Sequence, residues 1–368
     1  MTDAIFVLNA GSSSLKFRIF GAEDSLPLLG SGRIIGIGSK PEFSVDGKIY
    51  KQFRADLSQS GALQEIIDWL KHAGKELNII AMGHRIVHGG EDFSAPVMLT
   101  GYVLEKLSEL IPLAPLHQPH ALSSVKILKA LYPEPAQIGC FDTAFHASHV
   151  PVFRHYALPK HLRDRGVRRY GFHGLSYEWA AHVLAEKHPE LAQGRVVAAH
   201  LGNGASLCAM KAGKSIDTTM GMTALDGLPM GTRCGSIDPG VTLHMMRELG
   251  MSADEIDRTL SYESGLKGLS GISGDMRELV ASAKPEARFA VDYFTMMAAQ
   301  HVARMAVALG GLDALIFTGG IGEHQESVRQ AIVQHLAFLP SFTTLVVEAD
   351  EERMIARHCM TLLKEGKQ

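Results

Sequence analysis

The stretch IFVLNAGSSSLKF, residues 5–17, consists of two short apolar runs joined by small residues. Gly and Ser between two apolar runs predict a β-hairpin rather than a strand followed by a helix. A second stretch, VVAAHLGNGASLCAM at residues 196–210, repeats this pattern about half a chain later. The repeat predicts an internal duplication, and two unrelated Gly-rich hairpins are the alternative.

The rest of the chain alternates between strand and helix patterns. Apolar runs predict strands at 79–84, 136–142 and 314–318, and helical periodicity predicts helices at 62–72, 119–131, 176–188, 289–309 and 325–336. Ser252 followed by Glu255 predicts a capping box at the start of another helix. This order of elements is typical of an α/β protein.

Composition excludes several classes of protein. The 368 residues are 46% hydrophobic and 20% charged, as in ordinary globular proteins, and the length predicts two domains. A net charge of −3 without long runs of one sign argues against a nucleic-acid surface or a polybasic membrane anchor. Four dispersed cysteines predict neither a disulfide framework nor a zinc site, and the N-terminus lacks the features of a signal peptide. We therefore expect a cytoplasmic protein that binds neither nucleic acid nor membrane.

Three Gly-rich turns follow predicted strands, at residues 11–14, 202–205 and 319–322. Without a Cβ, such turns let backbone amides approach phosphate oxygens, and the third turn also opens a helix. The sequence has no P-loop motif, and the third turn lacks the acidic residue that a dinucleotide-binding fold has ~20 positions further on within a βαβ unit. A tight backbone bend explains each turn alone. Together, with Lys16 and Asn203 beside them, they favour a split nucleotide-binding site.

Arg85 and Arg233 both lie in Gly-rich loops. A planar guanidinium binds carboxylate or phosphate oxygens through two parallel hydrogen bonds. His173 stands in a short loop between two glycines, unlike most of the 18 histidines. These residues favour phosphoryl transfer between anions, and structural salt bridges of both arginines are the alternative.

Seven motifs then resemble those of the acetate kinases, in the same order over residues 5–357. They are NAGSSSLKF (9–17), HRIVHGG (84–90), FDTAFH (141–146), YGFHG (170–174), HLGNG (200–204), GTRCG (231–235) and TGGIGE (318–323). The resemblance implies two duplicated actin-like, ribonuclease H-like α/β domains with ATP in the cleft between them. It places the N-terminal domain at 1–147, with a helix at 352–368 packing back on it, and the C-terminal domain at 148–351.

The same resemblance implies reversible transfer of the γ-phosphoryl group of ATP to a short-chain carboxylate, with Mg²⁺ (or Mn²⁺) required, by a homodimer. The residues that it assigns to catalysis are Arg85, His117, Asp142, His173 and Arg233. Arg85 also binds the substrate carboxylate, and the acyl pocket is lined by Val87, Leu116, Phe172 and Ala224. The metal would be held by Asn9 and Glu351. The nucleotide contacts are assigned to Ser12, Ser14, Lys16, His200, Leu201, Gly202, Asn203, Gly204, Asp275, Met276, Arg277, Gly320, Ile321, Gly322, Glu323 and His324.

Physical chemistry qualifies one of these roles. The family treats Asp142 as a proton donor or acceptor, but a short carboxylic acid is already ionised near neutral pH, with a pKa of about 4. No proton therefore needs to be removed, and we expect Asp142 to orient an arginine or a metal-bound water.

The chain also departs from the family pattern. Gln118 stands where Asn is usual, Ala224 where the acyl pocket commonly has Pro, and Ser236 where an acidic residue is frequent. The segment between Glu323 and Glu351 is shorter than usual. A propionate or butyrate kinase is therefore an alternative to an acetate kinase, and a non-catalytic, actin- or chaperone-like ATP switch is the alternative from another class.

Overall fold

The computed structural model describes residues 1–11, 14–53, 56–73, 76–115 and 117–366. The chain divides into two compact units. Unit 1 comprises residues 1–144 and 350–368, and unit 2 comprises residues 145–349. Within the described residues, no helix has the length and apolar character needed to span a membrane.

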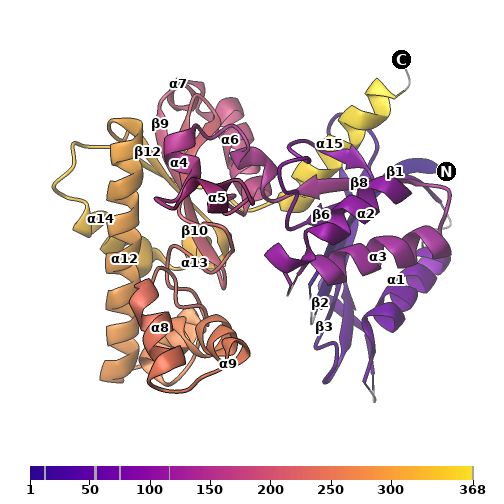
Figure 1. The fold of residues 1–368 in the computed structure, drawn as a ribbon. Helices are drawn as coiled ribbons and strands as arrows, with labels where there is room; N and C mark the ends of the chain where they lie inside the picture. The colour runs from indigo at the N-terminus through magenta and orange to yellow at the C-terminus, as the bar shows by residue number, and fades with distance from the viewer. Residues whose placement is uncertain (12–13, 54–55, 74–75, 116, 367–368) are drawn as a thin grey trace. The chain divides into compact units, whose positions relative to one another are not determined.

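Unit 1 is built around an eight-stranded sheet with the order β5-β4-β3-β2-β1-β6-β8-β7 (Figure 1). Its strands are β1 (Thr2–Ala10), β2 (Ser14–Gly21), β3 (Leu28–Ile35), β4 (Glu42–Val45), β5 (Lys48–Gln52), β6 (Leu77–Ile86), β7 (Val97–Met98) and β8 (Ala136–Phe141). Its helices are α1 (Gln59–Ala73), α2 (Gly101–Glu109), α3 (Gln118–Leu131) and α15 (Glu351–Glu365), with a 3₁₀ turn at Ile111–Leu113.

Helices cover both faces of this sheet. On one face, Phe6, Leu8 and Phe17 form a core with Ile66 of α1 and Leu128 of α3. On the other face, α15 packs against β1 and β6. A Cβ on Gly83 would lie within 2.5 Å of Ile355 and 2.9 Å of Cys359, so this glycine allows α15 to approach the sheet closely.

Unit 2 is built around a five-stranded sheet with the order β11-β10-β9-β12-β13. Its strands are β9 (Arg195–Leu201), β10 (Ala205–Lys211), β11 (Lys214–Thr218), β12 (Ala314–Thr318) and β13 (Thr343–Val346). Its longer helices are α6 (Gly174–Lys187), α8 (Pro239–Arg247), α12 (Pro285–Leu309) and α14 (Glu326–His335). The shorter ones are α4 (Pro151–Arg154), α5 (Lys160–Arg163), α7 (Pro189–Ala192), α9 (Ala253–Arg258), α10 (Gly265–Ser270), α11 (Met276–Ala281) and α13 (Gly319–His324), with a 3₁₀ turn at Ala144–His146 and a π-helical turn at Thr259–Glu263.

The two sheets confirm the duplication. In unit 1, β3-β2-β1 are antiparallel neighbours and β1-β6-β8 are parallel; in unit 2, β11-β10-β9 are antiparallel and β9-β12-β13 are parallel. Both predicted hairpins form, as β1–β2 and β9–β10. The predicted capping box at Ser252 and Glu255 is also present, at the start of α9. The fold is therefore the predicted α/β architecture, repeated once.

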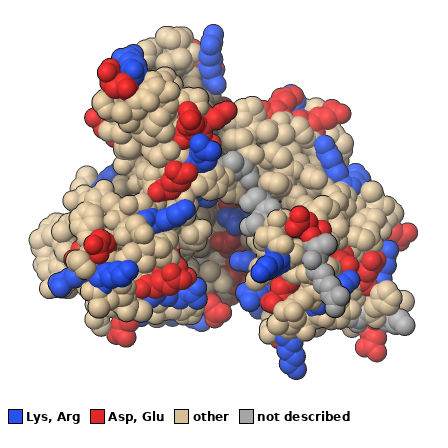
Figure 2. Space-filling model, turned by 90° about the horizontal axis from the view of Figure 1, so that it is seen from below, with Lys and Arg blue, Asp and Glu red and all other residues tan. Residues whose placement is uncertain are grey.

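The surface has mixed charge. On the face drawn in Figure 2, Lys and Arg side chains alternate with Asp and Glu side chains. This pattern agrees with the net charge of −3.

Candidate active site

Arg85 lies near the end of β6 and is held by two carboxylates of unit 1. Its Nε donates to both carboxylate oxygens of Asp142, at 2.9 and 3.1 Å, and its Nη2 donates to Oδ2 at 2.7 Å. Its Nη1 lies 3.3 Å from Oε2 of Glu351, the first residue of α15. Because β6 and β8 are parallel neighbours, their carboxyl ends bring Arg85 and Asp142 to the same edge of the sheet.

Burial and charge act against each other in this cluster. The side chain of Asp142 is only 2% exposed. Burial raises the pKa of its carboxyl, and the guanidinium of Arg85 opposes that shift. Burial alone would lower the pKa of Arg85, but the charges of Asp142 and Glu351 outweigh it and raise that pKa. Arg85 therefore stays charged and keeps its carboxylate partners.

Asn9 and Lys16 lie opposite each other in the β1–β2 hairpin. Phe6 and Leu8 belong to the core on the face of the sheet that α1 and α3 cover. Strand alternation therefore places Asn9 and Lys16 on the other face, the one that α15 covers. The turn closes where the Gly11 amide donates to the carbonyl of Ser14 at 2.8 Å. Ser12 lies outside the described residues.

The loop that follows β6 is held by Gln118, a fully buried residue in α3. Its Oε1 accepts from the His88 amide at 3.2 Å, and its Nε2 donates to the His88 carbonyl at 3.0 Å. Val87 precedes this clamp and is half-buried, while His117 is the N-cap of α3. Leu116 lies outside the described residues. Gln118 thus fixes the loop that carries Val87, a role that the sequence had not indicated.

In unit 2, the β9–β10 turn contacts two other segments, the loop at 231–233 and the turn that contains His173. The Gly202 amide donates to the Gly204 carbonyl at 3.0 Å, and the Gly231 amide donates to the Asn203 carbonyl at 3.0 Å. A Cβ on Gly204 would lie 3.4 Å from His173 Nε2 and 3.9 Å from Arg233 Nη1. The absence of a side chain at Gly204 therefore lets the backbone approach both predicted catalytic groups.

His173 is the N-cap of α6 and has left-handed backbone angles, φ 56° and ψ 23°. Its ring lies 4.4 Å from that of His200, measured between centroids. Its Nδ1 lies 2.8 Å from the hydroxyl of Ser206. Phe172, the preceding residue, is buried, and its carbonyl accepts a hydrogen bond from His146 Nε2 at 2.9 Å.

Arg233 contacts the segment that contains the predicted acyl-pocket residue Ala224. Its Nη1 donates to the Ala224 carbonyl at 3.1 Å and lies 3.7 Å from the sulfur of Met230. The structure therefore brings Ala224, Arg233, His173 and the turn at 202–205 of unit 2 together.

The third Gly-rich turn opens α13 directly after β12. Gly319 has φ +77° and packs against the backbone of Leu201, where a Cβ would lie 2.8 Å from the carbonyl oxygen. Glu323 accepts from the amides of Gly319 at 2.8 Å and of Ala349 at 3.0 Å. Its side chain is thus bound to this chain's own backbone. Gly319, Ile321 and Gly322 are buried, so a ligand would meet α13 at Gly320 and His324, which are exposed.

Asp275 and Arg277 lie at the start of α11 (Met276–Ala281), and the preceding Gly274 packs on the loop that is bonded to the β9–β10 turn. Asp275 is the N-cap, accepting from the Arg277 amide, and the two side chains form an ion pair that lowers the pKa of Asp275. A Cβ on Gly274 would lie 2.6 Å from the carbonyl oxygen of Gly231, the residue whose amide donates to the Asn203 carbonyl. Met276 and Leu201 are buried, so their side chains belong to the core.

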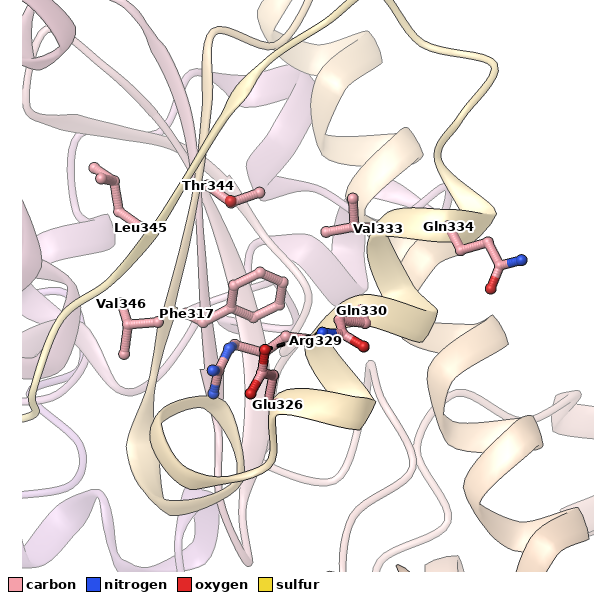
Figure 3. A pocket seen from close by; sticks show the side chains of 9 residues that line it. All are labelled: Phe317, Glu326, Arg329, Gln330, Val333, Gln334, Thr344, Leu345 and Val346. Carbon is pink, nitrogen blue, oxygen red and sulfur yellow. Dashed lines mark hydrogen bonds between the residues drawn. The ribbon is translucent and has the colours of Figure 1, made fainter.

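A pocket of about 500 Å³ lies elsewhere in unit 2, between α14 and the strands β12 and β13 (Figure 3). It is lined by Phe317, Glu326, Arg329, Gln330, Val333, Gln334, Thr344, Leu345 and Val346. Arg329 donates to the carbonyls of Gly322 and Glu323, and Gln330 donates to Glu326. None of the predicted site residues lines this pocket.

Comparison with known proteins decides the family. The acetokinase family model matches residues 4–360. The acetate kinase of Nitrobacter hamburgensis is 45% identical over 389 residues, covering 98% of this chain and 96% of the relative. The chain belongs to the acetokinase family.

Solved structures of the family agree. A propionate kinase from Francisella tularensis has a TM-score of 0.90 at 36% identity, covering 97% of this chain and 98% of that one. The acetate kinase of Porphyromonas gingivalis has a TM-score of 0.88 at 35% identity, covering 98% and 100%.

This chain is shorter than the relative from Rhodopseudomonas palustris. The alignment with an acetate kinase of Rhodopseudomonas palustris (strain TIE-1), 44% identical, extends over 398 positions and covers all of both chains. The relative therefore has about 30 residues that this 368-residue chain lacks. In the structure, only residues 336–342 join α14 to β13. That short connection lies inside the segment that the sequence indicated as reduced.

Proposed function

We propose that the chain transfers the γ-phosphoryl group of ATP to acetate, forming acetyl phosphate and ADP, and catalyses the reverse reaction. The single observation that carries this proposal is the arginine that two carboxylates hold at the edge of the unit 1 sheet, in a chain of the acetokinase family.

Arg85 is proposed to bind the acceptor carboxylate. Asp142 occupies the edge of the guanidinium formed by Nε and Nη2. The position of Glu351 shows that a carboxylate also reaches Nη1, on the other edge. An anionic acceptor would take the place of Glu351 at that edge, through charge-assisted hydrogen bonds to Nη1, while Asp142 keeps the opposite edge.

Asp142 is proposed to orient Arg85 rather than to move a proton. Its two oxygens accept three hydrogen bonds from one guanidinium, which fixes the plane and direction of that group. Acetate is ionised near neutral pH, so the reaction has no proton for Asp142 to remove.

His173, Arg233 and the Gly-rich turns are proposed to serve the nucleotide and the transferring group. Phosphoryl transfer needs little covalent chemistry from the protein, because catalysis consists of positioning and of donors for the charge on the equatorial oxygens. Arg233 Nη1 and His173 Nε2 both lie beside Gly204, and this proximity supports the proposal that they act on one phosphoryl group. Lys16 and the glycines at 202, 204 and 320 are proposed to contact the phosphates and ribose.

Mg²⁺ is proposed as the metal that accompanies ATP. Among the described residues, no group of three or more His, Cys, Asp or Glu side chains could enclose a metal. This fits Mg²⁺, which keeps several waters and binds through one or two protein oxygens and the substrate phosphates. Asn9 and Glu351 supply such oxygens beside the face of the sheet that α15 covers. When bound, the ion would neutralise charge on the phosphates.

A homodimer is proposed from the apolar surface of unit 2. Helix α8 buries none of its residues within the chain. Val241, Leu243, Met246 and Leu249 are between 41% and 62% exposed. An apolar helix without a packed face is typical of a surface that a partner covers. Sedimentation measurements would contradict the proposal if the protein stayed monomeric at micromolar concentration.

The acyl preference depends on Ala224. One methylene in a pocket of this kind is worth about 1–3 kcal/mol, so replacing the usual Pro by Ala is enough to shift selectivity toward propionate. The structural relative from Francisella tularensis is named a propionate kinase. Acetate and propionate are therefore the two acceptors to compare.

The test is ATP- and Mg²⁺-dependent hydroxamate formation with acetate, propionate and butyrate, alongside ADP release with glycerol and without acid. The strongest signal with acetate supports the proposal, and a stronger signal with propionate assigns the enlarged pocket to Ala224. Release of ADP without hydroxamate contradicts carboxylate phosphorylation and favours the ATP switch.

A further inference from the structure

The turn that carries His173 has an unfavourable backbone conformation. His173 has φ 56°, and Gly171 two residues earlier has φ +78°. A residue with a Cβ adopts left-handed angles only where the surrounding structure holds it there. The contacts around His173 therefore indicate what its position depends on.

Two buried hydroxyls supply this support. The Ser206 hydroxyl lies 2.8 Å from His173 Nδ1, and it is also hydrogen-bonded to the hydroxyl of Tyr177. Ser206 and Tyr177 are fully buried, so water does not provide these bonds. Tyr177 follows His173 by one turn of α6, where its amide donates to the His173 carbonyl at 3.1 Å. Ser206 comes from β10 and lies opposite His200, whose ring packs on that of His173.

The neighbouring backbone is held from the other side. His146 Nε2 donates to the Phe172 carbonyl at 2.9 Å, and its Nδ1 accepts from the Ser215 hydroxyl at 2.8 Å. A Cβ on Gly171 would lie 2.6 Å from the ring of His146. The turn is thus bound at its backbone by His146, and the ring of His173 is bound by Ser206.

The hydroxyl chain can set the tautomer of His173. If Tyr177 donates to Ser206, the Ser206 hydroxyl is free to donate to Nδ1, and the neutral imidazole then carries its proton on Nε2. Nε2 faces the Gly-rich turn, 3.4 Å from where a Cβ on Gly204 would lie. A proton at that atom makes His173 a donor toward a phosphoryl oxygen.

We propose that Ser206 and Tyr177 are positioning residues that hold His173 in its left-handed turn with the proton on Nε2. The inference rests on the proposed function, in which His173 stabilises the transferring phosphoryl group. The Tyr177 hydroxyl reaches the His173 ring through Ser206, so we expect the effect of removing that hydroxyl on kcat to disappear when Ser206 is absent.

Kinetics of a double-mutant cycle test this arrangement. Ser206→Ala is expected to lower kcat about 10- to 100-fold, in the range reported for misplaced catalytic donors, with the KM for acetate within twofold. Tyr177→Phe is expected to lower kcat by a smaller factor, and the double variant should be no slower than Ser206→Ala. Ser124→Ala, which removes a buried serine hydroxyl in α3 of unit 1, is the matched control and should keep full kcat. The proposal would be overturned if the losses of kcat in the two single variants multiplied in the double variant, or if both single variants kept full kcat.

A second readout does not depend on activity. In ¹⁵N-histidine-labelled protein at pH 8.5, where an ordinary imidazole is neutral, NMR distinguishes protonated Nε2 from protonated Nδ1. His173→Asn assigns the signal. We expect protonated Nε2 in the unaltered protein and a mixture in Ser206→Ala. A proton on Nδ1 in the unaltered protein would overturn the inference, whereas absence of hydroxamate together with the expected tautomer would contradict the proposed function alone.

Discussion

The two hairpins β1–β2 and β9–β10 have the same topology but lead to different chemistry. Beside the first, in unit 1, the predicted acceptor arginine is held by the carboxylates of Asp142 and Glu351. Beside the second, in unit 2, His173 is held by the hydroxyl of Ser206, and Arg233 bonds to a carbonyl and a thioether. One duplicated fold therefore carries a charged network in one unit and a largely neutral one in the other.

The difference matters because the two networks respond differently to change. Removing one member of a buried ion pair leaves an uncompensated charge, which destabilises the fold as well as the site. Removing a neutral hydrogen-bond partner costs less stability, and its effect falls mainly on catalysis. We therefore expect stability to depend on the site residues of unit 1 and turnover to depend on those of unit 2.

The largest expected effect is on turnover in unit 2. Arg233→Ala should lower kcat by about 10³-fold or more, as loss of an arginine does in other phosphoryl-transfer enzymes. The denaturant midpoint should fall less than in Asp142→Ala, because the bonds of Arg233 to the Ala224 carbonyl and the Met230 sulfur are to neutral atoms. Steady-state kinetics measures kcat, and urea unfolding measures the denaturant midpoint. A large loss of stability with kcat retained would reverse the comparison.

In unit 1, Asp142→Ala should reduce both stability and activity. Arg85 would lose the partner that binds its Nε and Nη2, and breaking such a pair costs about 3–5 kcal/mol. Urea unfolding measures the loss. Asp142→Asn keeps the shape and one acceptor oxygen, so it should retain more activity than Asp142→Ala if Asp142 orients Arg85. Equal and complete inactivation of both variants at full stability would instead favour a proton-transfer role.

Acid should destabilise unit 2 more than unit 1. Burial lowers the pKa of His146 and His301 to about 4 and that of His149 to about 3 in unit 2, whereas in unit 1 it lowers that of His84 to about 4. These folded-state pKa values lie below the unfolded value of about 6.5. As the pH falls from 6.5 toward 4, the histidines bind protons in the unfolded state before they do in the folded state, so the free energy of unfolding decreases. At pH 5.5 the loss is roughly 1 kcal/mol per histidine.

Buried carboxyls widen this contrast. Burial raises the pKa of Asp142 and Glu352 in unit 1 and of Asp217 in unit 2. A carboxyl with a raised pKa in the folded state binds its proton more tightly there, so it adds stability as the pH falls, whereas the buried histidines remove stability.

The chain's two tryptophans allow this prediction to be measured. Trp69 packs on the core of unit 1 and Trp179 on that of unit 2. In Trp179→Phe and Trp69→Phe variants, the fluorescence of the remaining tryptophan reports the unfolding of one unit. Urea midpoints at pH 7.5 and 5.5 that shift equally for both reporters would contradict the prediction.

The smallest expected effect concerns a neutral contact in unit 1. Gln118→Ala removes the bonds to the amide and carbonyl of His88 and should cost about 1–3 kcal/mol. Because this contact holds the loop that carries Val87, the KM for acetate should rise while kcat changes less. Lys126→Ala, an exposed site on the same helix, is the control. If Gln118→Ala lowered the free energy of unfolding as much as Asp142→Ala does, charged and neutral contacts would not differ in their contribution to stability.

Local patterns in the sequence predicted much of the fold. The helix at 289–309 was expected and forms as Pro285–Leu309, starting earlier because Pro285 suits the first turn of a helix. The strands β3, β4 and β5 were not predicted. β5 is exposed throughout, so it lacks the alternation that marks a half-buried strand. The conformation of His173 was equally hidden, because a positive φ at a residue other than Gly or Asn leaves little trace in sequence.

What the sequence determined by itself was the order of elements, the repeated hairpin and the family motifs, because apolar periodicity and Gly-rich turns are local properties of the chain. Only the tertiary structure decided which side chains meet. Arg85 binds Asp142 and Glu351 because parallel strands end at one edge of a sheet and α15 returns to that sheet. Ser206 meets His173 because α6, which begins after His173, packs on β9, the strand that pairs with β10. Such contacts join residues far apart in the chain, so no spacing in the sequence records them.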